Sequence, residues 1–200
     1  PAFFPEDTEF GEDVVAEMEG LPDSIDPSAF RGRIDLRAKR TFTIDPEDAK
    51  DFDDAIHIEQ RDGGLWEIGV HIADVSYFVQ QETATDLAAR ERGTSVYLVD
   101  RVIPMLPEKL SNDLCSLKPQ VDRLAFSCIM TLDADARVHD YRLERTVIRS
   151  HRRLTYEQAQ EFIDAGQTDD PVGLDVIAVN VLARKLTAER LGSGSIDFDT

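Results

Sequence analysis

The chain has 200 residues, and 40 Asp and Glu against 22 Lys and Arg give it a formal net charge of −18 at pH 7. Hydrophobic residues make up 42% of the chain, which is enough for one domain with its own core. It contains neither an apolar run of about 18 residues nor a cationic, apolar amino-terminal segment, so membrane and secreted classes find no support. Cys115 and Cys128 lack Cys-x-x-Cys spacing. We therefore predict a reduced, cytoplasmic location and no membrane partner.

Hydrophobic periodicity predicts a mixture of helices and strands. In chain order these are a short acidic helix over 9–19, strands over 41–45, 55–60 and 65–72 with a hairpin turn at 61–64 between the last two, a helix over 83–92 closed by Gly93, a strand that carries Tyr97, a loop around a short helix over 100–119, strands over 122–132 and 137–149, a helix from the N-cap Thr155 to Ala165, and a helix over 173–191.

The densest charge lies between the first two of these strands, where six acidic side chains fall within ten positions: Asp45, Glu47, Asp48, Asp51, Asp53 and Asp54. Repulsion between carboxylates about 4 Å apart costs on the order of 1 kcal/mol in water, and several times more when they are partly buried. A hard divalent cation relieves it, and oxygen ligands suit Mg²⁺, Mn²⁺ or Ca²⁺ better than Zn²⁺. A solvated acidic loop is the competing interpretation. An EF-hand fails because its glycine and closing glutamate are not at the required offsets.

The segment from Thr43 to Ala55 resembles the signature of the RNase II and RNase R exoribonucleases, whose catalytic region is the RNB domain. Further blocks resemble family segments in the same order: Gly69–Ser76, Arg92–Leu98, Ile103–Asn112 and Leu114–Leu117. The residues in these blocks are more similar to those of RNase R than to those of RNase II. The resemblance implies an α+β fold with an RNB-domain-like mixed sheet and flanking helices. It also divides the chain into a linker and helix over 1–30 and the amino-terminal part of the RNB domain over 31–200.

The same resemblance assigns a catalytic site. It maps the family's four metal-site aspartates onto Asp45, Asp51, Asp53 and Asp54, and the family's RNA-stacking tyrosine onto Tyr97. It implies processive hydrolysis of single-stranded RNA from the 3′ end with release of nucleoside 5′-monophosphates. The implied cofactor is a pair of Mg²⁺ ions, with Mn²⁺ as an alternative, one ion activating water and the other stabilising the leaving 3′ oxygen.

Parts of the family pattern have no counterpart in the chain. The family's catalytic arginine and glutamate lie in the second half of the RNB domain, and its OB-type RNA-binding domains flank that domain; none of them maps onto these residues. We therefore expect the domain to be incomplete in this chain, as a fragment that carries the metal site of a larger parent protein. The alternative is a non-catalytic RNA-binding or regulatory module derived from an RNB half-domain.

The charge pattern leaves two further interpretations open. A net charge of −18 argues against simple electrostatic binding of RNA, yet two basic clusters occur, for which salt bridging and phosphate contact are both open. They are Arg31, Arg33, Arg37, Lys39 and Arg40, and Arg142, Arg145, Arg149, Arg152 and Arg153. Acidic excess with only five lysines is also typical of a high-salt cytoplasm. That hypothesis predicts a melting temperature that rises with molar KCl.

Isolated polar residues are predicted to be structural. The four histidines, His57, His71, His139 and His151, have no metal-ligand spacing. Ser111 and Ser116 lack the His and Asp arrangement that a serine nucleophile needs. Asp74 closes a strand in a block that resembles the family, so we expect it near the site without a catalytic role.

Overall fold

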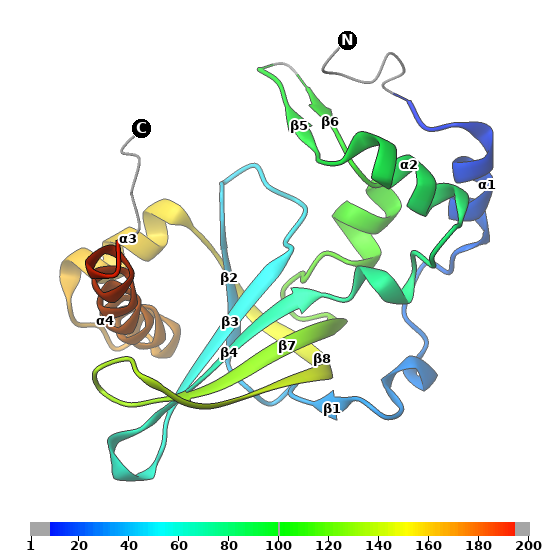
Figure 1. Ribbon diagram of the computed structural model, residues 1–200. Coiled ribbons are helices and arrows are strands. Elements are labelled where there is room, and N and C mark those ends of the chain that lie inside the picture. Colours follow the sequence, from blue (N-terminus) through cyan, green and yellow to red (C-terminus); the bar gives the residue numbers. More distant parts are fainter. Residues whose placement is uncertain (1–8, 100, 195–200) are drawn as a thin grey trace.

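The computed structural model describes residues 9–99 and 101–194 (Figure 1). Its regular elements, in chain order, are α1 (Glu12–Gly20), β1 (Ile34–Asp35), β2 (Thr41–Asp45), β3 (Asp54–Gln60), β4 (Trp66–Ala73), α2 (Ala84–Arg92), β5 (Val96–Tyr97), β6 (Val102–Ile103), β7 (Asp122–Leu132), β8 (Val138–Thr155), α3 (Tyr156–Ala165) and α4 (Pro171–Gly192). Single 3₁₀ turns lie at Pro27–Phe30, Asp62–Gly64 and Val75–Tyr77, and a π-helical turn at Leu110–Leu114.

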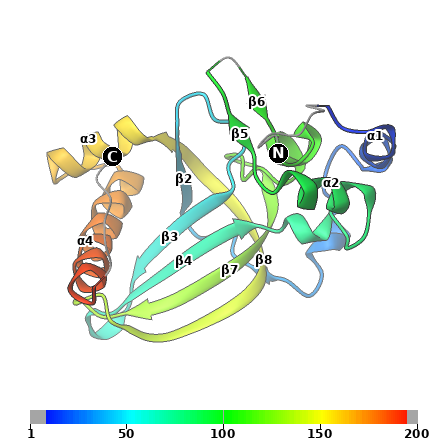
Figure 2. The ribbon, with the colours of Figure 1, turned by 45° about the horizontal axis from the view of Figure 1, so that its top comes forward.

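The main sheet closes on itself. Its strand order is β1-β8-β2-β3-β4-β7, and β7 also pairs with β8. The amino-terminal part of β8 runs antiparallel to β7, whereas its residues 150–155 run parallel to β2. The strands β8, β2, β3, β4 and β7 therefore form a ring, and Figure 2 shows the strong curvature that this requires. The mixed sheet that the sequence predicted is confirmed.

A row of polar side chains crosses the inner side of this ring. His57 Nδ1 lies 2.8 Å from His71 Nε2, and His71 Nδ1 lies 2.7 Å from Ser127 Oγ. Ser127 Oγ lies 2.6 Å from Thr146 Oγ1. These four side chains come from β3, β4, β7 and β8, and each residue is at most 1% exposed. The row thus links four strands by hydrogen bonds away from water.

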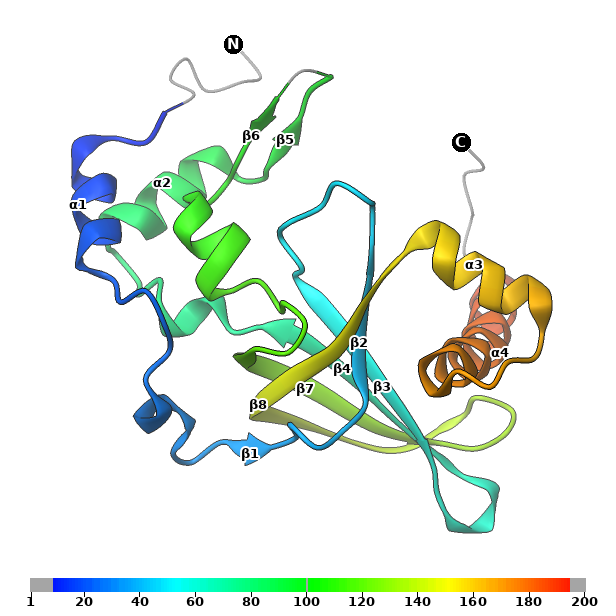
Figure 3. The same cartoon turned by 180° about the vertical axis from the view of Figure 1, so that it is seen from behind.

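Helices α3 and α4 cover the outer face of the ring at one side, and α1 and α2 lie at the opposite side (Figures 1 and 3). Thr155 and Gln158 form a capping box at the start of α3. Apolar residues of α3 and α4 pack against β2, β3, β4 and β8 in two clusters, which include Phe42, Leu154, Ala159, Val176, Ile58, Ile68 and Leu182. Among the described helices, none combines the length and the apolar composition that crossing a bilayer requires. The cytoplasmic location stays a prediction.

The other core cluster lies beneath the segment that precedes β7. Leu110, Leu114 and Leu117 are at most 1% exposed and pack with alanines of the ring. Helix α1 joins this side of the molecule, because Met18 packs against the same cluster and the Glu17 carboxylate accepts hydrogen bonds from the first backbone N–H groups of α2. The predicted domain boundary at residue 30 stays a prediction.

The predicted elements agree with the structure for most of the chain. The bounds of β2 and β7 match the predicted 41–45 and 122–132, and Tyr97 lies on β5 as predicted. The main difference is β8, which continues six residues beyond the predicted end at 149 because that stretch pairs with β2. The two-residue strands β1 and β6 were also missed. Asp100 and residues 195–200, the ends of a predicted loop and of the predicted RNB segment, lie outside the described residues.

Candidate active site

The acidic run forms the connection between β2 and β3. Strand β2 ends at Asp45, because Pro46 has no N–H to continue the ladder. Strand β3 begins at Asp54. Between them Phe52 is buried in the core cluster beneath the loop, and its neighbours Asp51 and Asp53 line a cleft on the other side. A single buried aromatic side chain thus anchors a loop that is otherwise strongly charged.

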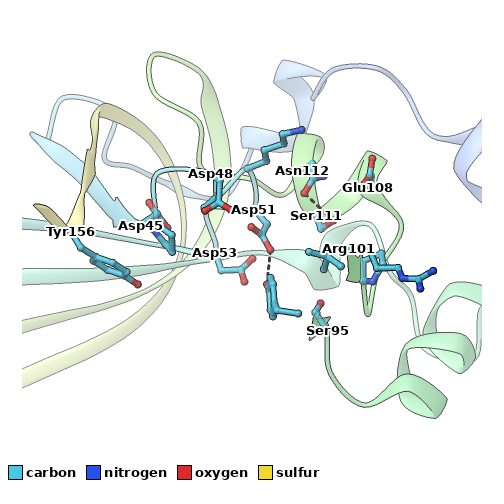
Figure 4. Close-up of a pocket in the computed structure, with 16 residues that line it drawn as sticks. Asp45, Asp48, Asp51, Asp53, Ser95, Arg101, Glu108, Ser111, Asn112 and Tyr156 are labelled. Atoms are coloured by element: carbon cyan, nitrogen blue, oxygen red, sulfur yellow. Dashed lines mark hydrogen bonds between the residues drawn. The ribbon is translucent and has the colours of Figure 1, made fainter. Parts of the chain in front are cut away.

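The cleft has a volume of about 680 Å³. One wall is the acidic loop, and the facing wall comes from the β5–β6 hairpin through Ser95, Tyr97, Arg101 and Val102. Glu108, Ser111 and Asn112 from the turn before β7 and Tyr156 from the start of α3 complete the lining (Figure 4). Segments far apart in the sequence therefore meet around the acidic loop.

The structure brings three of the four predicted aspartates into this cleft. Asp45, Asp51 and Asp53 line it, whereas Asp54 is an exposed residue at the start of β3 and is not part of the lining. Asp54 is nevertheless close enough that its charge acts on Asp45 and Asp53. Asp48 also lines the cleft, although it lies outside the predicted set.

Burial and mutual repulsion disfavour charge on two of these carboxyls. Burial of Asp45, followed by the negative charge of Asp54, raises its pKa above the usual value. Asp53 keeps an exposed surface, yet the surrounding protein displaces water from it, and this effect together with the charges of Asp51, Asp54 and Asp45 raises its pKa as well. The loop therefore holds negative charge against an electrostatic penalty.

The residues fit a hard cation by their chemistry, although they are not assembled around one. Asp45 Oδ2 is buried without a hydrogen-bond partner among the described residues, so this carboxylate oxygen is not satisfied by the protein. All the acidic groups at the cleft are oxygen donors, the type that Mg²⁺ and Mn²⁺ prefer. Within the described part of the chain, no three His, Cys, Asp or Glu side chains are already grouped closely enough to hold a metal ion. Binding a cation would therefore require these side chains to move toward one another.

Tyr97 lies beside the predicted aspartates. Its hydroxyl donates a hydrogen bond to Asp51 Oδ2 at 3.0 Å. The residue is 67% exposed, so its ring is open to a ligand. Without the family resemblance, the sequence favoured a buried position for Tyr97 in the core of a strand. The exposure of the ring excludes that position.

Tyr156 is a lining residue that sequence reasoning missed. It is the first residue of α3, directly after the N-cap Thr155, and it is 57% exposed. Figure 4 shows it at the end of the cleft near Asp45. An aromatic side chain at the first position of a helix carries no signal of its function in the sequence. Only the exposure and the cleft reveal it.

Most arginines of the two basic clusters form salt bridges within the chain. Arg33 pairs with Asp74 at 2.7 Å, with both side chains buried. The other pairs are Arg37 with Asp35 and Asp122, Arg40 with Asp175, Arg142 with Glu67, Arg149 with Asp122, and Arg152 with Asp170. Arg153 instead donates a hydrogen bond to the carbonyl oxygen of Pro46. The salt-bridge interpretation holds for the arginines that pair with acidic side chains.

Comparisons with known proteins now place the chain. The family model described as RNB domain matches residues 33–200. Ribonuclease R 1 of Lactococcus lactis is 42% identical over 197 residues, which cover 96% of this chain and 24% of that protein. The structure of Mycoplasma genitalium RNase R in complex with ribose-methylated single-stranded RNA superposes with a TM-score of 0.87 at 29% identity, over 96% of this chain and 30% of that one.

A more distant structure shares the fold alone. Yeast Ssd1, described as a pseudonuclease, has a TM-score of 0.73 at 22% identity, over 86% of this chain and 21% of that one. The chain spans about a quarter of the length of the curated relative in Lactococcus lactis. The match to the family model covers most of the chain, and the RNase R similarity extends over nearly all of it. The chain therefore belongs to the RNB domain family.

Proposed function

We propose that the chain forms the metal-binding part of a hydrolytic 3′-to-5′ exoribonuclease that depends on Mg²⁺, with Mn²⁺ as an alternative, and releases nucleoside 5′-monophosphates from single-stranded RNA. The observation that carries this proposal is the buried, unpartnered oxygen of Asp45 in a cleft where several carboxylates repel one another. A fold that retains such an electrostatic cost does so at functional sites. Membership of the RNB domain family supports the same reaction.

The aspartates supply the cation site in this proposal. Asp45, Asp51 and Asp53 would hold Mg²⁺ from within the cleft and Asp54 from its edge. Bound there, Mg²⁺ would supply Lewis acidity at a phosphate oxygen and lower the pKa of a bound water. The cation would also cancel the repulsion that raises the pKa values of Asp45 and Asp53.

The two exposed tyrosines would position the RNA. Tyr97 and Tyr156 both line the cleft, and each presents an aromatic ring to solvent. Stacking of a base on such a ring contributes about 1 to 3 kcal/mol and tolerates every base, because all four have a π face. The hydrogen bond from Tyr97 to Asp51 couples the stacking surface to one carboxylate. An exonuclease without sequence preference needs this kind of contact.

A non-catalytic module that binds RNA is the second candidate. It is favoured by the observation that no three potential ligands among the described residues are grouped to hold a metal. The fold does not decide between the candidates, because Ssd1 shares it and is described as a pseudonuclease. Cleavage must therefore be measured.

The decisive experiment incubates the protein with 5′-labelled single-stranded RNA and Mg²⁺ or Mn²⁺. Asp54→Asn replaces one ligand oxygen by an amide nitrogen, and EDTA removes the cation. The matched control is Glu47→Gln, which removes one charge from the same loop at a residue outside the cleft lining. RNA binding is measured in parallel by filter retention for each variant.

The proposal predicts a 3′-to-5′ product ladder that is lost with EDTA and in Asp54→Asn, while Glu47→Gln retains it. RNA binding should largely persist in Asp54→Asn, because Tyr97 and Tyr156 are unchanged. Cleavage by Asp54→Asn at near the wild-type rate would refute the metal assignment. RNA binding that depends on metal, without cleavage, would favour the non-catalytic module.

A further inference from the structure

A buried serine holds the acidic loop from beneath. The Ser116 hydroxyl accepts a hydrogen bond from the backbone N–H of Phe52 at 3.1 Å and donates one to the carbonyl oxygen of Lys50 at 2.7 Å. Ser116 is 0% exposed. Its neighbour Leu117 donates its N–H to the carbonyl oxygen of Phe52 at 2.8 Å. The two residues that flank Asp51 are therefore fixed by three hydrogen bonds to one short segment.

The serine is itself fixed to the ring. Arg123 on β7 donates from Nε to the carbonyl oxygen of Ser116 at 2.8 Å and from Nη2 to the carbonyl oxygen of Asp113 at 3.0 Å. Arg123 is 6% exposed. On the other side of the loop, Ala73 of β4 donates its N–H to the carbonyl oxygen of Asp53 at 2.9 Å. The loop backbone is thus tied to two strands of a closed sheet.

These ties act against the charge of the loop. Repulsion among the carboxylates drives them apart when no cation is bound, and a loop that moved apart would have to be reassembled each time a cation arrived. A backbone that is already fixed lowers this cost, because less conformational freedom is lost on binding. The hydroxyl of Ser116 is well placed to do this, because it bonds to both sides of Asp51 at once.

We propose that Ser116 is a positioning residue of the metal site: its buried hydroxyl holds the backbone on both sides of Asp51, so that Asp51 and Asp53 are oriented for the cation. This inference rests on the proposed function, since it assumes that the aspartates bind a divalent cation. Ser116 does not touch the cation or the RNA. It acts through the loop that carries the ligands.

Ser127 provides a matched control within the same chain. It is also 0% exposed, and its hydroxyl also bridges two partners, His71 and Thr146. Its bonds lie inside the ring and reach no residue of the acidic loop. A Ser→Ala change at either position removes one buried hydroxyl with two hydrogen bonds, so both variants should lose similar stability. Only a change at Ser116 should alter cation affinity.

The experiment titrates Mn²⁺ into the full chain and follows the electron paramagnetic resonance signal of free Mn²⁺. The proteins are wild type, Ser116→Ala, Ser116→Cys, Ser127→Ala and Asp45→Asn, and urea unfolding reports the stability of each. Hydrogen exchange at the Phe52 amide adds a readout that needs no metal. Residues that support metal ligands typically change affinity by roughly 10- to 100-fold when mutated.

The inference predicts a Kd for Mn²⁺ roughly 10- to 100-fold higher in Ser116→Ala, faster exchange at the Phe52 amide, and a Kd in Ser127→Ala within about threefold of wild type. Ser116→Cys should give an intermediate Kd because a thiol is a weaker hydrogen-bond donor, and it decides the matter if Ser116→Ala does not fold. Equal affinity in wild type and the folded Ser116 variants would overturn the inference, as would an equal loss in Ser127→Ala. No Mn²⁺ binding by wild type beyond that of Asp45→Asn would instead overturn the proposed metal site itself.

Discussion

The cleft and the inside of the strand ring both bury polar side chains, and they differ in how those groups are satisfied. Inside the ring, His57, His71, Ser127 and Thr146 are linked in a row by short hydrogen bonds. At the cleft, Asp45 has a buried oxygen without a hydrogen-bond partner among the described residues, and its carboxyl is crowded by other acids. In the ring only the outermost nitrogen of the row, His57 Nε2, has no hydrogen-bond partner among the described residues, and it lies 3.5 Å from Glu67 Oε1. At the cleft, the unpaired oxygen of Asp45 lies among carboxylates that repel it, which leaves it available to a cation.

The difference separates a structural role from a functional one. A buried polar row that is paired link by link rigidifies the strands that carry it, and a change within it costs stability. A group of carboxylates that repel costs stability as it stands, so its presence points to a ligand. A substitution inside the ring should therefore lower stability and leave metal affinity unchanged. A substitution of a cleft carboxylate should lower activity without lowering the stability of the metal-free protein.

The largest effect is expected from Asp45→Asn. Loss of the ligand should reduce RNA cleavage by roughly a thousandfold, which corresponds to about 4 kcal/mol of activation free energy. The same change removes a carboxyl group whose pKa is raised by burial and by the charge of Asp54, so the metal-free protein should become more stable at pH 7. Cleavage assays and thermal unfolding in EDTA measure the two effects.

Glu47→Gln serves as the control for that variant, because it removes a charge from the same loop outside the cleft lining. It should leave both cleavage and melting temperature near wild type. A metal-free Asp45→Asn protein that melts below wild type would show that the carboxylate stabilises the fold, and the contrast between the two regions would then be lost.

Gly69→Ala should have the largest effect on stability inside the ring. A Cβ at this position would lie 2.2 Å from His57 Cε1 and 3.0 Å from His71 Nε2. Both rings are buried and held by hydrogen bonds, so neither can move without breaking the row. We expect a loss of about 3 kcal/mol in the free energy of unfolding, measured in urea.

The control for this variant is Gly20→Ala, because a Cβ at Gly20 would have no atom within 4 Å and the backbone there needs no positive φ. Its stability should stay within about 0.5 kcal/mol of wild type. Mn²⁺ affinity of the folded fraction of Gly69→Ala should be unchanged, since the row does not reach the acidic loop. A well-tolerated Gly69→Ala would mean that the histidine rings have room to move.

Local patterns were sufficient to predict much of the fold. Alternation of polar and apolar residues over 41–45 predicted β2, and a long strand expected near 122–132 matches β7. The end of β8 was not predictable, since residues 150–155 are extended through parallel pairing with β2, a contact between distant segments. Their Arg-rich sequence has no pattern of its own that favours a strand.

The candidate site divides in the same way. The aspartates were found because their order resembles a family signature, and three of them do line one cleft. Tyr156 was missed because its place in the cleft depends on where the tertiary fold positions the start of α3. Ser116 was considered only as a nucleophile and rejected, since its two bonds join residues 66 and 64 positions away in the chain. Contacts of this range leave no local signal.

The histidine row predicts an acid-sensitive fold. Burial, followed by the proximity of His57, lowers the pKa of His71 to about 3, and burial lowers that of His57. Below pH 6.5, His71 binds a proton in the unfolded chain but not in the folded protein. The contribution of neutral His71 to stability is therefore fully present above pH 6.5 and is lost as the pH falls toward 3. Between pH 6.5 and 4.5, this effect of His71 alone should lower the free energy of unfolding by about 2 to 3 kcal/mol.

Urea unfolding at several pH values measures this loss. His71→Gln cannot titrate, so its stability should be lower at pH 7 but should depend less on pH in the same window. The depressed pKa of Glu67, about 2, acts only below its ordinary value of 4.5 and therefore does not contribute to this window. Equal slopes in wild type and His71→Gln would show that the row does not exclude the proton.

The smallest effect is expected from Tyr97, and it tests how far the cleft acts on RNA rather than on metal. Tyr97→Ala removes the exposed ring, and the loss of one stacking contact should weaken RNA binding by about 1 to 3 kcal/mol and change the length of the shortest product. Tyr97→Phe keeps the ring and removes only the hydrogen bond to Asp51 Oδ2. Its product ladder should match wild type, whereas its Mn²⁺ affinity should change by a few-fold at most, because that bond orients one of several ligands. An unchanged ladder in Tyr97→Ala would exclude the ring from holding the 3′ end, and would leave Tyr156 as the aromatic contact of the cleft.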